Sequence, residues 1–83
     1  MTAYILKNNR LTGIQDITGW PVSQIAHLSR AAKMTGRTIL IADRGLSICC
    51  VCREFLHLCE IEEGLISHGY CKEHYRKALA ECQ

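Results

Sequence analysis

The hydrophobic and polar positions at the start of the chain predict a β-hairpin. Residues 4–7 and residues 10–14 form two short runs rich in apolar side chains, and Asn8-Asn9 separates them. Asparagine tolerates the positive φ that a two-residue hairpin turn requires. We therefore expect two antiparallel strands here, followed by a connector rich in turn-forming residues at positions 16–20.

After Pro21 the hydrophobic period becomes that of a helix. Proline suits the first helical turn because its backbone has no N–H to leave unpaired, and Gly36 is the type of residue at which helices end. We expect a helix that runs to about Thr35. Its apolar side comprises Val22, Ile25, Leu28, Ser29 and Ala32. A second side comprises His27, Arg30, Lys33, Met34 and Arg37.

A β-branched run at residues 38–42 predicts a strand that is buried on both faces. The Asp43-Arg44-Gly45 segment should turn the chain, so that residues 46–48 return as its antiparallel partner. This second hairpin would carry Cys49 at its end. Alternation in residues 53–59 then places Phe55, His57 and Cys59 on one face.

The last segment has the period of a helix with one apolar stripe. The stripe comprises Cys71, His74, Tyr75, Ala78, Leu79 and Cys82. Charged residues take the rest of the helix surface, so we expect Cys71 and His74, in the first turn, to face inward.

The chain is short, and its cysteines offer a way to stabilise it. Eighty-three residues make one domain whose core alone gives thin stability, and six cysteines can supply disulfides or a metal site. The N-terminus lacks the pattern of a signal peptide, and no apolar run reaches the length of a membrane span. We therefore expect a cytoplasmic chain with reduced thiols, in which clustered cysteines indicate metal. In an oxidising compartment the six cysteines would form three disulfides instead.

Two pairs of metal-binding residues share the same spacing. Cys49 and Cys52 lie three apart, as do Cys71 and His74, and eighteen residues separate the pairs. This spacing is typical of a tetrahedral zinc site. The first pair suits a knuckle at the end of a hairpin. The second lies in the first turn of a helix, where the helix dipole favours thiolates. We therefore expect these four side chains to bind Zn²⁺.

These segments predict a single small α+β domain stabilised by zinc. Residues 1–48 form a half with a hairpin, a helix and a strand, and residues 49–83 form the zinc-binding half. A knuckle hairpin followed by a helix that carries the second pair is the treble-clef arrangement. Strand order is left open, and so is the choice between a monomer and a homodimer.

Other cysteines and histidines compete for these positions. Cys50 can replace Cys49 as the partner of Cys52, although one intervening residue fits a tetrahedral chelate less well. His68 is the rival of His74, unless its imidazole only hydrogen-bonds locally beside Gly69. Three further residues are either part of the core or members of a second site, namely His57, Cys59 and Cys82.

Residues 67–74, Ser-His-Gly-Tyr-Cys-Lys-Glu-His, resemble the SHG-x-C-x-x-C segment that ends a small cysteine-containing domain in many bacterial sensor kinases and response-regulator-linked proteins. In that family a C-x-x-C followed by basic residues lies upstream, and residues 49–53 are similar to it. His74 stands where the family has cysteine, which zinc accepts as Cys₃His. The likeness covers about residues 49–80. It implies a bacterial or phage, cytoplasmic, signalling-associated module.

The function that these features predict is binding rather than catalysis. The chain has no nucleophile elbow, phosphate-binding loop or zinc-protease motif, and a closed Cys₃His site leaves no open position on the metal. We expect a protein-interaction adaptor with Trp20, Tyr70 and Tyr75 as candidate anchors.

The alternative is a nucleic-acid-binding protein that uses the basic stripe Arg30, Lys33 and Arg37. The charge distribution gives this reading some support, because residues 1–48 carry a net charge of +4 and residues 49–83 carry −2.

Overall fold

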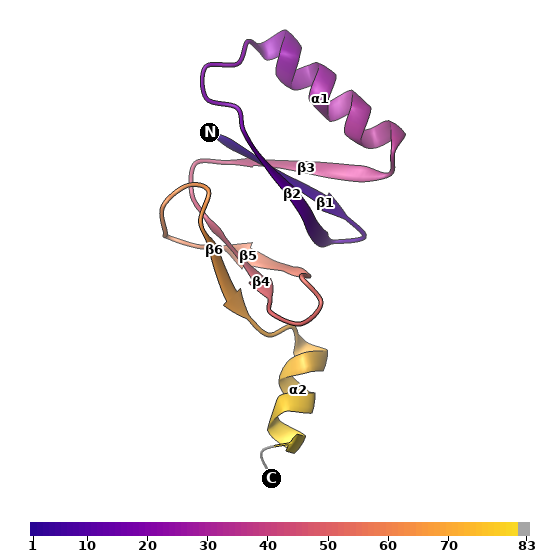
Figure 1. Ribbon diagram of the computed structural model, residues 1–83, viewed down its shortest axis with the longest axis vertical. Coiled ribbons are helices and arrows are strands. Elements are labelled where there is room, and N and C mark those ends of the chain that lie inside the picture. Colours follow the sequence, from indigo (N-terminus) through magenta and orange to yellow (C-terminus); the bar gives the residue numbers. More distant parts are fainter. Residues whose placement is uncertain (82–83) are drawn as a thin grey trace.

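The computed structural model describes residues 1–81, which contain six strands and two helices (Figure 1). In chain order these are β1 (Thr2–Lys7), β2 (Arg10–Asp16), α1 (Val22–Met34), β3 (Arg37–Ala42), β4 (Leu46–Cys49), β5 (Phe55–Leu58), β6 (Ile66–Gly69) and α2 (Lys72–Glu81). The strands form two three-stranded sheets, with orders β2-β1-β3 and β5-β4-β6. This confirms the predicted α+β class.

The N-terminal hairpin is confirmed. Asn8 and Asn9 adopt φ values of 53° and 62°, and Lys7 pairs directly with Arg10 across the turn. Two successive residues with positive φ match the right-handed twist of the flanking strands, and asparagine reaches this conformation at low cost. β3 pairs with the other side of β1, which is therefore the central strand of the first sheet.

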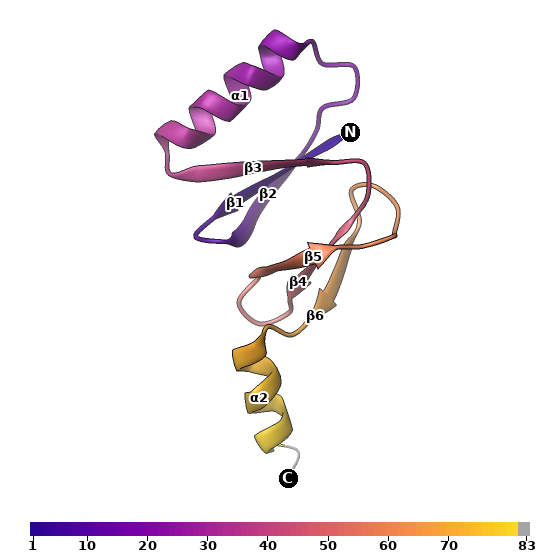
Figure 2. The same ribbon diagram turned by 180° about the vertical axis from the view of Figure 1, so that it is seen from behind.

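The predicted helix also forms, as α1. Pro21 precedes it in extended conformation, and the chain leaves it through Thr35 and Gly36, whose φ is 73°. α1 covers the outer face of the first sheet (Figures 1 and 2). Of its residues only Ala32 is buried, and Val22 is exposed although it belongs to the predicted apolar side.

The prediction for residues 38–42 is wrong in two respects. β3 lies at the edge of the first sheet, where it pairs with β1 alone, and Ile41 is 38% exposed. β4 does not return along β3. It pairs with β5 in antiparallel and with β6 in parallel orientation in the second sheet. The Asp43-Arg44-Gly45 segment therefore carries the chain from one sheet to the other.

The main core lies between the two sheets. Its buried residues come from strands of both sheets and are Tyr4, Leu6, Leu11, Ala42, Leu46 and Ile48. The half-buried side chains of Leu40, Phe55 and Ile66 pack against them. The molecule is elongated, 53 × 28 × 13 Å, with α1 outside the first sheet and α2 beyond the second (Figure 1).

Tyr4 connects the two sheets through its hydroxyl group as well as its ring. The side chain is fully buried on β1. Its O–H donates to the Arg44 carbonyl oxygen at 2.9 Å and accepts the Gly64 N–H at 3.0 Å. Both partners belong to loops at the edge of the second sheet, so one side chain fixes two loops to the first sheet.

We expect Tyr4→Phe to lower the free energy of unfolding by about 1–3 kcal/mol, because it removes two hydrogen bonds to partly buried backbone groups, each worth about 0.5–1.5 kcal/mol. Urea titration of the full chain measures this change. Tyr75→Phe is the matched control, since that ring is exposed on α2, and its effect should stay within about 0.5 kcal/mol. Equal effects of the two substitutions would contradict the bridging role of Tyr4.

Candidate metal centre

The turn between β4 and β5 brings Cys49 and Cys52 together. The Arg53 N–H donates to the Cys49 carbonyl oxygen, and the Cys49 N–H donates to the Glu54 carbonyl oxygen, each at 2.9 Å. Arg53 has a φ of 65°, the left-handed conformation that closes this tight reversal. The two cysteines thus lie on one compact bend of the backbone, as expected for a knuckle.

β6 delivers the second pair to the same place. It runs parallel to β4, and the Cys50 N–H donates to the Gly69 carbonyl oxygen at 2.8 Å, which holds the end of β6 beside the turn. The chain then enters α2, whose first turn is closed by the Tyr75 N–H on the Cys71 carbonyl oxygen at 2.8 Å. Cys71 and His74 therefore face the knuckle from the start of the helix.

One potential ligand atom from each of Cys49, Cys52, Cys71 and His74 lies within 4.8 Å of the others. Cys52 Sγ is 3.9 Å from Cys71 Sγ. His74 Nδ1 is 3.5 Å from Cys49 Sγ and 3.1 Å from Cys71 Sγ. A tetrahedron with ordinary zinc bond lengths has edges of about 3.8 Å between two sulfurs and about 3.5 Å between sulfur and nitrogen. The four side chains can therefore hold a metal ion at this spacing.

The surroundings of the cluster favour a thiolate at Cys49. Burial acts to raise the pKa of this thiol, but the backbone N–H groups of Cys52, Cys71 and Val51 outweigh it and lower the pKa to about 6. The N–H of His74 acts to lower the pKa of Cys71, yet burial and the neighbouring Cys49 and Cys52 raise it overall. A metal cation would offset the effect that raises the pKa of Cys71, because it stabilises every thiolate that binds it.

The competing residues lie outside this cluster. Within residues 1–81, the residues that come close enough to hold a metal ion form one group, and it includes neither Cys50 nor His68, both of which are exposed. Cys59 is half-buried and its Sγ lies 3.6 Å from His57 Nδ1, but this pair has no third member. The five described cysteines are free thiols. Cys82 lies outside the described residues.

The knuckle turn is also joined to the N-terminal hairpin. The Leu11 N–H donates to the Arg53 carbonyl oxygen at 3.0 Å, and Arg53 Nε donates to the Leu11 carbonyl oxygen at 3.1 Å. The Phe55 N–H donates to the Asn9 carbonyl oxygen at 2.8 Å. These bonds fix the turn to the first sheet, and nothing in the sequence pattern predicted them.

Cys71 and His74 face inward as predicted, whereas most of the apolar stripe farther along the last helix is exposed. Cys71 is buried and His74 half-buried, but Tyr75 and Leu79 are 55% and 47% exposed. None of the residues from Lys72 to Glu81 is buried. α2 projects away from the second sheet (Figures 1 and 2). Its position therefore depends on the contacts of its first turn.

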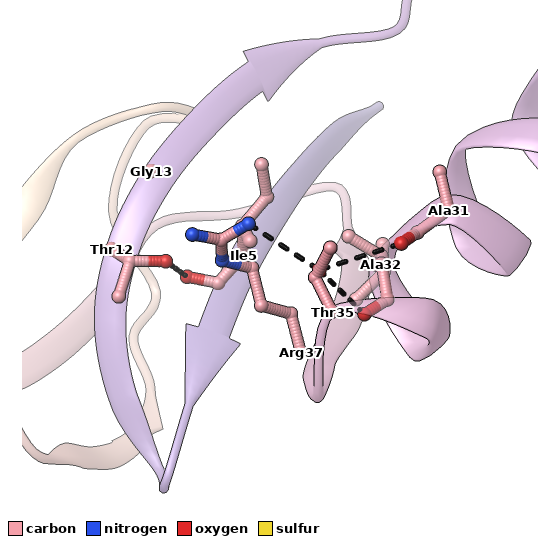
Figure 3. Close-up of a pocket in the computed structure, with 8 residues that line it drawn as sticks. Ile5, Thr12, Gly13, Ala31, Ala32, Thr35 and Arg37 are labelled. Atoms are coloured by element: carbon pink, nitrogen blue, oxygen red, sulfur yellow. Dashed lines mark hydrogen bonds between the residues drawn. The ribbon is translucent and has the colours of Figure 1, made fainter.

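The basic residues predicted as a nucleic-acid stripe, Arg30, Lys33 and Arg37, are all exposed, at the C-terminal part of α1 and the start of β3. Arg37 borders an open pocket of about 310 Å³ between α1 and the first sheet. The other lining residues are Ile5, Thr12, Gly13, Ala31, Ala32, Thr35 and Ile39 (Figure 3). Arg37 Nη1 donates to Thr35 Oγ1 at 3.3 Å across this pocket.

Comparison with protein-family models, with curated proteins and with solved structures finds no match for this chain. In the part of the chain that the structure describes, neither helix combines the length and the apolar composition needed to cross a bilayer. The site itself, with its one imidazole and three thiols, is therefore the main basis for a functional proposal.

We expect Cys52→Ser to weaken zinc binding at least about tenfold, because even substitutions outside the ligand shell of zinc sites cost about 10–100-fold. Competition with a chromophoric chelator measures the affinity. Cys50→Ser is the matched control, since it removes a neighbouring thiol that lies outside the cluster. If the Cys50 variant lost affinity and the Cys52 variant kept it, the assignment of the ligands would be wrong.

Proposed function

We propose that this chain is a structural zinc module in which Cys49, Cys52, Cys71 and His74 are the ligands. The observation that carries the proposal is the convergence of four ligand atoms within 4.8 Å from two separate segments. Three thiolates and one imidazole in tetrahedral arrangement suit zinc better than magnesium or calcium, which prefer oxygen ligands. The donors are also those of many structural zinc sites.

A structural role follows from the number of ligands. Four protein ligands complete a tetrahedral shell, so substrate or water has no free position on the metal. We therefore propose a binding protein and not an enzyme. The β4–β5 hairpin followed by α2 supports a treble-clef-like arrangement, with the parallel strand β6 as an additional element. The cytoplasm, where thiols stay reduced, is the compartment that we propose.

We further propose that the module presents α2 to a protein partner. Tyr75 and Leu79 on α2, and Val51 in the knuckle turn, are each about half exposed or more, and so is Tyr70 just before the helix. Aromatic and large apolar side chains are enriched where interfaces derive most of their affinity. The metal would hold the turn and the helix in one arrangement. The resemblance to the segment in bacterial signalling proteins supports the same role.

Removal of the metal should unfold the C-terminal part of the chain first. Structural zinc contributes about 10–16 kcal/mol in finger peptides, comparable with the whole stability of a small domain, about 5–15 kcal/mol. In hydrogen exchange with a strong chelator, we expect α2 and residues 50–54 to lose protection before β1, β2 and β3. Metal analysis of the untreated protein should give one colourless zinc per chain. Cooperative melting that is indifferent to chelation would overturn the structural role.

The role of α2 is tested with a partner purified from the source cells and titrated calorimetrically. We expect Tyr75→Ala with Leu79→Ala to weaken binding about 30-fold or more, since even one hot-spot side chain contributes at least about 2 kcal/mol. Val22→Ala with Met34→Ala is the control, because it removes exposed apolar side chains from α1. Equal losses in both variants would contradict a specific surface on α2, and a concentration-dependent homodimer would identify a second copy as the partner.

A further inference from the structure

Three basic side chains form a row across the first sheet, one on each strand. Lys7 on β1 lies directly opposite Arg10 on β2 and directly opposite Arg37 on β3. Residues opposite one another in antiparallel strands point to the same face of the sheet. Neighbouring strands are about 4.8 Å apart, so the row spans roughly 10 Å. All three side chains are exposed.

Two more cations lie beside this row. Lys33 is in the last turn of α1, which leads through Thr35 and Gly36 directly to β3, and Arg30 lies one turn earlier. The C-terminal end of α1 and the β1–β2 turn lie on the same side of the molecule (Figures 1 and 2). We refer to the five residues Lys7, Arg10, Arg30, Lys33 and Arg37 as the basic rim.

Among the described residues, no carboxylate forms an ion pair with the basic rim. In the described part of the chain, the ion pairs involve Arg44, Lys77 and the terminal ammonium group, and no residue of the rim. The single acidic residue among residues 1–42 is Asp16, at the far end of β2 from Arg10. Glu54 lies opposite Arg10 in an isolated bridge, and its carboxylate accepts a hydrogen bond from Asn9 Nδ2 at 3.4 Å.

This arrangement is unfavourable for the isolated protein. Like charges directly opposite one another across neighbouring strands destabilise a sheet, and cross-strand pairs of this kind matter by about 0.2–1 kcal/mol each. Lys7 takes part in two such pairs. An external polyanion would convert this repulsion into attraction and would release counterions when it binds.

We propose that the basic rim binds the sugar–phosphate backbone of a nucleic acid. An extended row of exposed cations matches a linear series of phosphates better than a compact anion, which needs an enclosed site. A membrane surface fits less well, because an interfacial helix needs a free apolar face. On α1 the apolar residues Ile25, Leu28 and Ala32 are half-buried or buried instead. The rim is independent of the metal ligands, so this proposal does not rest on the zinc site.

The test is fluorescence anisotropy with the full zinc-loaded chain and three labelled probes of one sequence: 20-nucleotide single-stranded DNA, the same RNA, and duplex DNA. For three or four neutralised phosphates, the logarithm of the association constant should fall with the logarithm of salt concentration with a slope of about −2 to −4. Binding to any of the three probes with such a slope supports the proposal. The relative affinities show which form of the backbone is preferred.

Substitution of the row should remove this binding. We expect the triple variant Lys7→Ala, Arg10→Ala, Arg37→Ala to lose at least about tenfold in affinity at 100 mM salt, and its slope to shift toward zero by about 1 per lost phosphate contact. The matched control is Lys72→Ala, Arg76→Ala, Lys77→Ala, which removes the same charge from α2. Its affinity should stay within about threefold of the original. Lys7→Gln alone should shift the slope by about 1 with minimal change to the sheet.

Three results would overturn the proposal. They are the absence of binding to all probes at 50 mM salt, equal losses in the two triple variants, and binding to phosphatidylserine vesicles without binding to nucleic acid. Zinc content and thermal melting of each variant show that the fold is kept. The rim variants leave the four metal ligands unchanged. The nucleic-acid proposal can therefore be overturned while the metal site is confirmed, and the metal site can be overturned while nucleic-acid binding is confirmed.

Discussion

The arrangement of the C-terminal half depends on four side chains that converge from two segments. α2 buries none of its residues, and the knuckle turn exposes Val51, so apolar packing contributes little to either. Besides the backbone hydrogen bonds of the turn, the two segments meet through their ligand side chains, with His74 Nδ1 3.5 Å from Cys49 Sγ and Cys71 Sγ 3.9 Å from Cys52 Sγ. A shared cation would supply the attraction that the apolar side chains do not. The rest of the second sheet is held differently, through the core that it shares with the first.

Much of the local structure could be predicted because local rules determine it. Asn8-Asn9 specifies a two-residue turn, Pro21 and Gly36 delimit a helix, and the spacing of the cysteines places two ligands on a bend. Each of these signals acts on the backbone within a few positions of the residue that carries it. The proximity of the two ligand pairs is not local, yet it too could be predicted, because a common metal geometry relates the two spacings. The identity of the ion stays a prediction.

The features that could not be predicted are those determined by pairing between distant segments. The run at residues 38–42 reads as a buried strand, but in the described residues β3 pairs with β1 alone, so it is an edge strand with one side unpaired and Ile41 exposed. The exposure of Tyr75 and Leu79 could not be predicted, because a helical stripe shows which residues share a side, not whether anything covers them. The pairing of Lys7 with Arg10 follows from the two-residue turn, whereas its pairing with Arg37 requires knowledge of the sheet.

The hydrogen bond that joins the two sheets and the cluster of ligand side chains enclose different lengths of chain. This difference bears on the order of folding. The contact between Tyr4 and Gly64 closes a segment of 60 residues, whereas the contact between Cys49 and His74 closes one of 25. The entropy lost on closing the shorter loop is smaller by about 0.8 kcal/mol at room temperature. The ligand pairs can therefore meet before the sheets dock. The early capture of an ion would then give the N-terminal hairpin a preformed surface on which to condense.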